Sequence, residues 1–231
     1  MGESISMQVI AHIRSDFSTK FGIPRQSGLV AELEADVVFA PEYRDRNALR
    51  GLEDFTHIWL IWNFSASHGW APTVKPPRLG GNTRMGVFAT RSPFRPSPVG
   101  LSCVRLRSIS WDTPEGPVLH VSGADLMDGT PILDIKPYIP YADSHPEASV
   151  GFTAQGGDYR VRVVFPPELL RKIPGSRQHA LLGVLAQDPR PSYQDDPERV
   201  YGMTFAGWDV RFRVADGVLR VVEVVKLTEN E

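Results

Sequence analysis

The sequence predicts a mainly β protein, with a β-rich domain followed by a small α+β domain. Short apolar segments, many of them alternating with polar residues, recur at intervals of roughly ten to twenty residues, as strands do in barrels and sandwiches. Twenty prolines and twenty glycines punctuate the chain, most densely between Pro72 and Pro140, which leaves no room there for long helices. After about residue 146 the composition changes and a helical pattern appears. We therefore expect domains at residues 1–146 and 147–231.

The strands expected in the first domain follow from apolar or alternating patterns. A single helical turn is expected at Arg46–Glu53, where Gly51 can adopt the conformation that ends a helix. Periodicity alone leaves a barrel and a sandwich open as the way these strands pack. The expected strands are Met7–Arg14, Val37–Phe39, Thr56–Phe64, Arg84–Ala89, Leu101–Ile109, Pro117–Ser122 and Ile132–Tyr138.

The second domain should combine a helix with a small sheet. Pro166, Pro167 and Glu168 form a proline-led, acidic helix start, and the helical pattern runs to Gln187 with a break expected at Gly175. Asp216-Gly217 is a strong signal for a hairpin turn. The strands expected around these features are Tyr159–Phe165, Tyr201–Phe205, Trp208–Val214 and Val218–Val225.

Composition excludes several classes of protein. Of the 231 residues, 42% are hydrophobic and 23% charged, which is typical of a globular protein. No apolar run is long enough for a membrane span, and the first residues lack the pattern of a signal peptide. Cys103 is the only cysteine, so an internal disulfide is excluded, and its alternating surroundings favour a buried structural thiol over a nucleophile. We expect a cytoplasmic protein without membrane contact.

Charge is distributed unevenly along the chain although its net value is only −2. Between Asp54 and Asp112 there is no acidic residue, which indicates a local basic surface for a phosphate or carboxylate ligand. The alternative is that acidic residues from elsewhere in the sequence pair with these cations in the fold. The cations of this segment are Lys75, Arg78, Arg84, Arg91, Arg95, Arg105 and Arg107.

Stiff loops carry the candidate ligand-binding residues. In Gly86–Ser102, three prolines restrict the backbone around Arg91 and Arg95, and a preorganised guanidinium loses less entropy when it binds an anion. Pro24 restricts the backbone beside Arg25 and Gln26 in the same way. Lys75–Asn82 contains two glycines but lacks the spacing of a nucleotide-binding loop.

A metal site is not supported by the sequence. Asp125, Asp128 and Asp134 are close together, but Asp128-Gly129-Thr130-Pro131 is a turn sequence in which Asp is favoured for its own hydrogen bonding. The six histidines are scattered without ligand spacing. We therefore expect no metal cofactor.

Five stretches of the sequence, taken in order, resemble one family. They are similar to the TrmO (TsaA/YaeB-like) tRNA methyltransferases through about residues 8–144, and Asp188–Tyr193 and Tyr201–Val214 resemble that family's smaller C-terminal domain. The resemblance implies a small β-barrel that is unlike Rossmann-type methyltransferases. The five stretches are Lys20–Gln26, Leu52–Trp62, Lys75–Asn82, Gly86–Pro96 and Asp125–Tyr138.

The resemblance also implies an activity and its partners. It implies an S-adenosyl-L-methionine-dependent enzyme, a homodimer, that methylates N6 of threonylcarbamoyl-adenosine at position 37 of tRNA. Where the family often has Phe-His-Gln, this chain has Phe64-Ser65-Ala66, so contacts there are limited to the backbone or a short hydroxyl. The positions that match the family's cofactor contacts are Pro24, Arg25, Gln26, Ser65, Ala66, Arg91, Leu101, Asp128, Gly129, Thr130 and Pro131.

Two further roles follow for this reaction. Loss of the N6 proton would be helped by a base, for which Asp134, Lys136 and Tyr138, on one face of an expected strand, are the candidates. The tRNA backbone would bind basic residues in a salt-dependent manner. The candidates for that contact are Lys75, Arg78, Arg84 and Arg95.

Two other classes of function remain open from the sequence. One is a regulator that binds S-adenosylmethionine or a nucleotide on the same barrel without catalysis. The other is an RNA-binding or dimerisation module that binds no cofactor. Methyl transfer to tRNA separates the enzyme from both.

Overall fold

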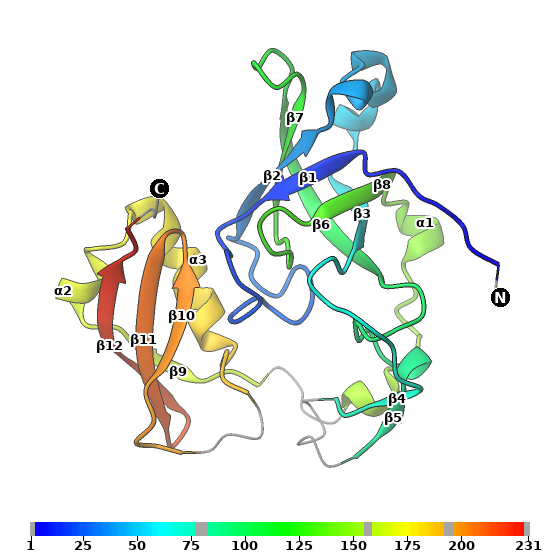
Figure 1. Ribbon diagram of the computed structural model, residues 1–231. Coiled ribbons are helices and arrows are strands. Elements are labelled where there is room, and N and C mark those ends of the chain that lie inside the picture. The colour runs from blue at the N-terminus through cyan, green and yellow to red at the C-terminus, as the bar shows by residue number, and fades with distance from the viewer. Residues whose placement is uncertain (1–2, 77–82, 155–158, 192–195, 229–231) are drawn as a thin grey trace.

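The barrel is the central feature of the computed structural model, which describes residues 3–76, 83–154, 159–191 and 196–228. Six strands close into it in the order β1-β2-β7-β6-β3-β8, and every neighbouring pair is antiparallel (Figure 1). The mainly β prediction is confirmed, and the barrel is the form that the strands take. The strands are β1 (Ala11–Arg14), β2 (Glu34–Phe39), β3 (His57–Asn63), β6 (Val99–Ser110), β7 (Val118–Ser122) and β8 (Pro131–Pro137).

Alternation along the strands places one set of side chains inside the barrel. In β3, Ile58, Leu60 and Trp62 are buried, while the residues between them are only half-buried. In β6 the inward positions include Val104 and Leu106, and the outward positions include arginines. This period of two is what a strand with one buried face requires.

The expected strand at Arg84–Ala89 is only partly correct. A two-residue strand β5 (Met85–Gly86) pairs with the equally short β4 (Thr73–Val74), and a 3₁₀ helix, η5 (Val87–Ala89), follows at once. The chain turns there because Val87 becomes almost fully buried and Thr90 closes the turn by donating its backbone N–H to the Val87 carbonyl. The expected strand at Met7–Arg14 begins only at Ala11, the first residue that pairs with both β2 and β8.

Short helical turns connect the strands. The turn expected at Arg46–Glu53 is present as two 3₁₀ helices, and Gly51 lies between them with a φ of 85°, which favours glycine. In the described part of the chain outside the C-terminal sheet, the short helical elements besides η5 are η1 (Pro41–Tyr43), η2 (Arg46–Leu49), η3 (Leu52–Asp54), α1 (Pro140–Asp143) and η6 (Gly151–Ala154).

The C-terminal part is a four-stranded sheet in the order β10-β11-β12-β9, packed against one longer helix (Figure 1). The helical pattern is in two pieces as predicted, although Gly175 begins the second piece instead of separating the two. Asp216 and Gly217 both have positive φ at the predicted hairpin. The elements are β9 (Arg162–Val164), α2 (Pro167–Leu170), α3 (Gly175–Ala186), β10 (Tyr201–Phe205), β11 (Trp208–Ala215) and β12 (Val218–Lys226).

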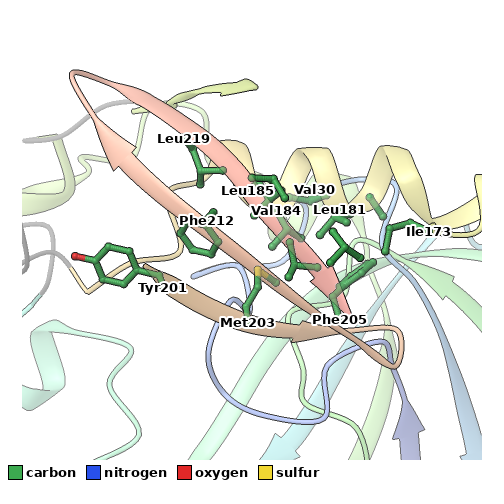
Figure 2. Packing of buried hydrophobic residues seen from close by; sticks show 14 of the residues in the cluster. Val30, Ile173, Leu181, Val184, Leu185, Tyr201, Met203, Phe205, Phe212 and Leu219 are labelled. Atoms are coloured by element: carbon green, nitrogen blue, oxygen red, sulfur yellow. The ribbon is translucent and has the colours of Figure 1, made fainter. Parts of the chain in front are cut away.

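The core of the C-terminal sheet includes residues from the first part of the chain. Phe17, Val30 and Leu33, all in the loop between β1 and β2, belong to the same buried cluster as α3 and β10–β12. Figure 2 shows Val30 among the side chains of the helix and sheet. The Phe17 ring meets Phe205 of β10 edge-on, with ring centroids 5.5 Å apart. The division at residue 146 stays a prediction, and the β1–β2 loop packs across it.

None of the helices in the described part of the chain has the length and apolar character that a membrane span requires.

Candidate functional site

A pocket of about 460 Å³ is formed where four segments of the barrel part meet. The segments are the β1–β2 loop, the end of β3 with the residues after it, the stretch from η5 into β6, and the β7–β8 connection. Its volume lies within the range of small-molecule sites, roughly 300–1,000 Å³. Its apolar walls include Trp62, Phe64 and Leu101, and its charged groups include Arg91 and Asp125.

Side chains fasten the loops around this pocket to one another. Lys20 of the β1–β2 loop donates hydrogen bonds to the Ala66 carbonyl and to the Ser67 hydroxyl, which lie after β3. Arg91 donates to the side-chain oxygen of Gln26, so the η5–β6 stretch is bonded to the β1–β2 loop as well. The walls of the pocket are therefore held in place by contacts between loops that are far apart in the sequence.

A chain of hydrogen bonds lies at the inner wall of the pocket. Trp62 donates from Nε1 to the Ser102 hydroxyl at 3.0 Å, and Ser102 donates to Oδ1 of Asp125 at 2.5 Å. Trp62 can lie there because residue 100 is glycine: a Cβ at Gly100 would be 2.3 Å from the indole ring. Ser102 is fully buried, so its hydroxyl needs these partners.

The carboxyl group of Asp125 lies in an environment that disfavours its charge. Burial raises its pKa above the ordinary aspartate value, while the hydrogen bond from Ser102 and the charge of Arg91 act in the opposite direction. A largely buried carboxylate facing a pocket is a typical feature of a binding or catalytic site. Asp125 is therefore a candidate site residue.

The turn after Asp125 supports the β1–β2 loop. Asp128 accepts a hydrogen bond from the backbone N–H of Ser15 at 3.0 Å, and its own backbone N–H donates to the Phe17 carbonyl. Gly129 has a φ of 73° and donates to the Ile13 carbonyl, which brings the turn onto β1. The predicted turn is confirmed, and Thr130 closes it by donating its backbone N–H to the Met127 carbonyl, but the Asp128 carboxylate bonds Ser15 and not its own turn.

Most of the residues matched to the family's cofactor contacts lie together at the pocket. Three of the matched positions, Asp128, Gly129 and Pro131, lie beside it in the supporting turn and outside its lining. As ligand contacts, all eleven positions stay predictions. Those in the lining are Pro24, Arg25, Gln26, Ser65, Ala66, Arg91, Leu101 and Thr130.

The expected proton acceptors are not brought into the pocket. Lys136 forms an ion pair with Asp134 at 2.9 Å, and Tyr138 packs against the Trp59 ring with centroids 5.8 Å apart. The β3–β8 pairing shifts register between Ile61 and Trp62, so Ile132 points into the barrel but Asp134, two residues on, does not. Their role as bases stays a prediction.

The expected RNA contacts differ in their surroundings. Arg95 lines the pocket, where its guanidinium donates to the carbonyls of Thr90 and Ser92 and lies over the Phe88 ring. Arg84 donates to the Thr73 hydroxyl at 2.9 Å. Lys75 is exposed, and Arg78 lies outside the described residues.

The basic segment is not neutralised by acidic side chains in the part of the chain that the structure describes. The ion pairs found there involve other arginines, such as Arg14 with Glu115, Arg46 with Asp112 and Arg177 with Glu34. Among the described residues, the alternative of pairing with distant acids is therefore not seen for Lys75, Arg84, Arg91, Arg95, Arg105 and Arg107.

Comparison with known families agrees with this architecture. Residues 12–144 match the family model of the tRNA-methyltransferase O N-terminal domain, and residues 158–227 match that of the TrmO C-terminal domain. The chain belongs to the TrmO family. The resemblance inferred from the sequence motifs is therefore confirmed.

The relatives cover between three quarters and nearly all of the chain. A tRNA (adenine(37)-N6)-methyltransferase from Escherichia coli K12 is 40% identical over 230 residues, covering 94% of this chain and 97% of that protein. One from Eikenella corrodens is 47% identical over 179 residues, covering 76% of this chain and 99% of that protein. A crystal structure of TrmO from Pseudomonas aeruginosa matches with a TM-score of 0.77 and 33% identity, covering 96% of this chain and all of that one.

Two polar residues at this site are not among the predicted site residues: Asp125, which lines the pocket, and the fully buried Ser102 behind it. In the sequence, Asp125 stands near Asp128 and Asp134, a group that does not support a metal site, and Ser102 is part of an expected strand. A signal was present in each case. In the expected strand, Ser102 falls on the same face as the apolar residues Val104 and Leu106. Asp125 lies between the apolar Ala124 and Leu126. A polar residue in such a position needs a partner.

Proposed function

We propose that this TrmO-family protein transfers a methyl group from S-adenosylmethionine to N6 of adenosine 37 in tRNA, and that the acceptor is threonylcarbamoyl-adenosine. The observation that carries the proposal is the convergence of most matched cofactor positions on one pocket. The names of the relatives support the same reaction: two are tRNA (adenine(37)-N6)-methyltransferases. A third, from Pseudomonas aeruginosa, is named a putative S-adenosylmethionine-dependent methyltransferase.

The residues of the pocket fit this cofactor chemically. Apolar surface from Trp62, Phe64 and Leu101 suits a nucleoside, and the guanidinium of Arg91 suits the carboxylate of an amino acid. When bound, the cofactor supplies a methyl group on a positively charged sulfur. The bonds from Lys20 to Ala66 and from Arg91 to Gln26 hold the loops before any ligand arrives. Such preorganisation lowers the entropic cost of binding.

The part played by the protein in this reaction is mainly alignment. Methyl transfer is an in-line displacement, so holding the two reactants in register supplies much of the rate. The carbonyl substituent on N6 of threonylcarbamoyl-adenosine weakens the nucleophile but acidifies its proton. Asp134, Lys136 or Tyr138 could accept that proton only if the adenine that receives the methyl group reaches the outer side of β8. Alanine substitutions that leave turnover intact at all three positions would remove this role.

The activity is tested by nucleoside mass analysis of tRNA incubated with the protein and labelled cofactor. Two matched tRNA samples are compared, one with and one without the threonylcarbamoyl group. We expect one added methyl on threonylcarbamoyl-adenosine in the first sample only, and a large loss of product with Arg91→Ala. Detection of a methyl group on unmodified adenosine 37 would support the tRNA methyltransferase activity but reject threonylcarbamoyl-adenosine as the acceptor.

The same experiment addresses the other classes of function. Cofactor binding without transfer to either tRNA would favour a regulator on the same barrel. Binding of tRNA without any cofactor binding would favour an RNA-binding module. The homodimer is a separate part of the proposal, and light scattering at micromolar protein concentration tests it; a monomeric mass would reject it.

A further inference from the structure

Two opposite charges face the pocket without forming an ion pair with each other. Arg91 donates to Gln26, and Asp125 accepts from Ser102; the ion pairs of the described residues do not join the two. They are nevertheless close enough for the charge of Arg91 to act on the pKa of Asp125. A pocket that holds a cation and an anion separately is complementary to a ligand that carries both charges.

The orientation of Asp125 is determined by its neighbours. An indole N–H can only donate, so Trp62 occupies an acceptor site of the Ser102 hydroxyl. The hydroxyl proton of Ser102 is then directed to Oδ1 of Asp125. Asp125 therefore acts as an acceptor in this chain, and its carboxylate is fixed against the inner wall.

The position of Asp125 relates it to the residues expected to bind the cofactor. Its side-chain hydrogen-bond donor, Ser102, directly follows Leu101 in β6. Thr130 of the following turn lines the same pocket. Asp125 thus lies among the matched cofactor positions although no match assigned it to them.

We propose that Asp125 binds the α-ammonium group of the methionyl part of the cofactor, while Arg91 binds the α-carboxylate. In an α-amino acid the two groups are attached to one carbon, so their partners must come from one region of the pocket, as Asp125 and Arg91 do. The inference rests on the proposed function, because it takes S-adenosylmethionine as the ligand. A largely buried carboxylate that loses solvent regains stabilisation when an ammonium group arrives.

The test is isothermal calorimetry of the full chain without tRNA, using three ligands. S-adenosylmethionine and S-adenosylhomocysteine both carry the α-ammonium group, whereas 5′-methylthioadenosine keeps the nucleoside and lacks the amino acid. Asp125→Asn keeps an acceptor for Ser102 and removes the charge. We expect it to raise the Kd of the first two ligands by about 10- to 100-fold, the range for a charged hydrogen bond, and to change the third less than twofold.

The other outcomes overturn the inference in distinguishable ways. Equal weakening of all three ligands would assign Asp125 to the nucleoside or to pocket structure. Weakening of S-adenosylmethionine alone would assign it to the sulfonium charge. Unchanged binding of all three would assign it no part in cofactor affinity. If the wild-type chain binds none of the ligands, the proposed function itself fails, which separates the two failures.

Matched variants keep the test valid if Asp125→Asn is poorly folded. Ser102→Ala leaves the charge of Asp125 but removes its orienting donor, and we expect a smaller loss with the same ligand pattern. Arg91→Ala also breaks the bond to Gln26, so it should weaken both ligands somewhat, but S-adenosylmethionine clearly more than decarboxylated S-adenosylmethionine, which keeps the ammonium and lacks the carboxylate. Because Ser102 also accepts from Trp62, a small loss for 5′-methylthioadenosine is compatible with the inference, whereas an equal loss for all three ligands would contradict it. Asp54→Asn, an exposed position outside the pocket, is the control.

Discussion

At the scale of single residues, the pocket depends on positions where a small or polar side chain replaces a core residue. Gly100 leaves room for the Trp62 indole, and Ser102 joins that indole to Asp125. An alanine at 100 would place a Cβ 2.3 Å from the ring, so the indole would have to move and its bond to Ser102 would be lost. The chemistry of the site is therefore tied to the packing at this end of β3 and β6.

The raised pKa of Asp125 leads to a prediction about stability without ligand. Because folding disfavours its charged form, the stabilisation from this carboxyl group is fully present below its unfolded pKa, about 3.9, and is lost as pH rises through the higher folded pKa. Asp125→Asn should therefore become more stable relative to wild type as pH rises from about 4 to 7. Urea unfolding across that range measures the difference.

The control for this pH effect is Asp54→Asn, because Asp54 is exposed. Its stability difference from wild type should change little over the same pH range. A difference for Asp125→Asn that stays constant from acid to neutral pH would contradict the prediction. If it holds, Asp125 lowers stability in exchange for ligand binding, as functional groups in pockets often do.

At the scale of elements, the β1–β2 loop is bound on two sides. Toward the barrel, Gly28 donates to the Gly123 carbonyl. Toward the C-terminal sheet, Ala206 donates to the Asp16 carbonyl, and Arg177 of α3 forms ion pairs with Asp16 and Glu34. The loop that presents Pro24, Arg25 and Gln26 to the pocket therefore takes its shape partly from the C-terminal part.

Phe17→Ala tests whether this support matters for the pocket. Removing the buried ring, which packs on Phe205, should lower the free energy of unfolding by about 3–5 kcal/mol. It should also weaken cofactor binding at a temperature where the variant is still folded. Leu219→Ala, in the same core but on β12, is the control, since it should lose stability with a smaller change in affinity. Equal affinities for the two variants would contradict the role of the loop.

The elements were predictable from sequence to the extent that local pattern determines them. The hairpin at Asp216-Gly217 and the split helix around Gly175 follow from local chemistry, and both are present. The short β5 was not predictable, because its end depends on the burial of Val87. The register shift opposite Ile61 and Trp62, which separates Asp134 from the inward face, is likewise a property of strand pairing. Arg25, Gln26, Arg91 and Arg95 follow from proline-restricted loops in the sequence, and the resemblance adds Ser65, Ala66, Leu101 and Thr130. Asp125 required the fold.

At the scale of the whole molecule, positive charge is concentrated near the β4–β5 ladder and the pocket, although the net charge of the protein is small. Arg84 and Lys75 lie beside the short β4–β5 ladder, and Arg95 lies at the pocket. Since the described residues do not pair these cations with acids, they are available to an anionic polymer. The overall charge of −2 then limits non-specific attraction to nucleic acid elsewhere.

The affinity for tRNA should therefore fall steeply with salt. Each phosphate contact contributes about 0.7–0.9 to the slope of log K against log salt concentration. Arg84→Ala should reduce the slope by about that amount, as measured by fluorescence anisotropy at several salt concentrations. Arg220→Ala, an exposed position on β12, should leave it unchanged. An affinity of the wild type for tRNA that does not change with salt would contradict the proposal that tRNA binds this face.

The core shared by the β1–β2 loop and the C-terminal sheet couples ligand binding at the pocket to the opening of that sheet, although the two are far apart in the sequence. A ligand that binds the ordered conformation of the β1–β2 loop stabilises the state in which Phe17, Val30 and Leu33 are packed in the core of the C-terminal sheet. By linkage, that ligand also protects α3 and β10–β12 from opening. Amide hydrogens of a sheet that does not touch the pocket should then exchange more slowly when the pocket is filled. Conversely, a partner that binds the outer side of that sheet and stabilises it would raise the affinity of the barrel pocket for its ligand.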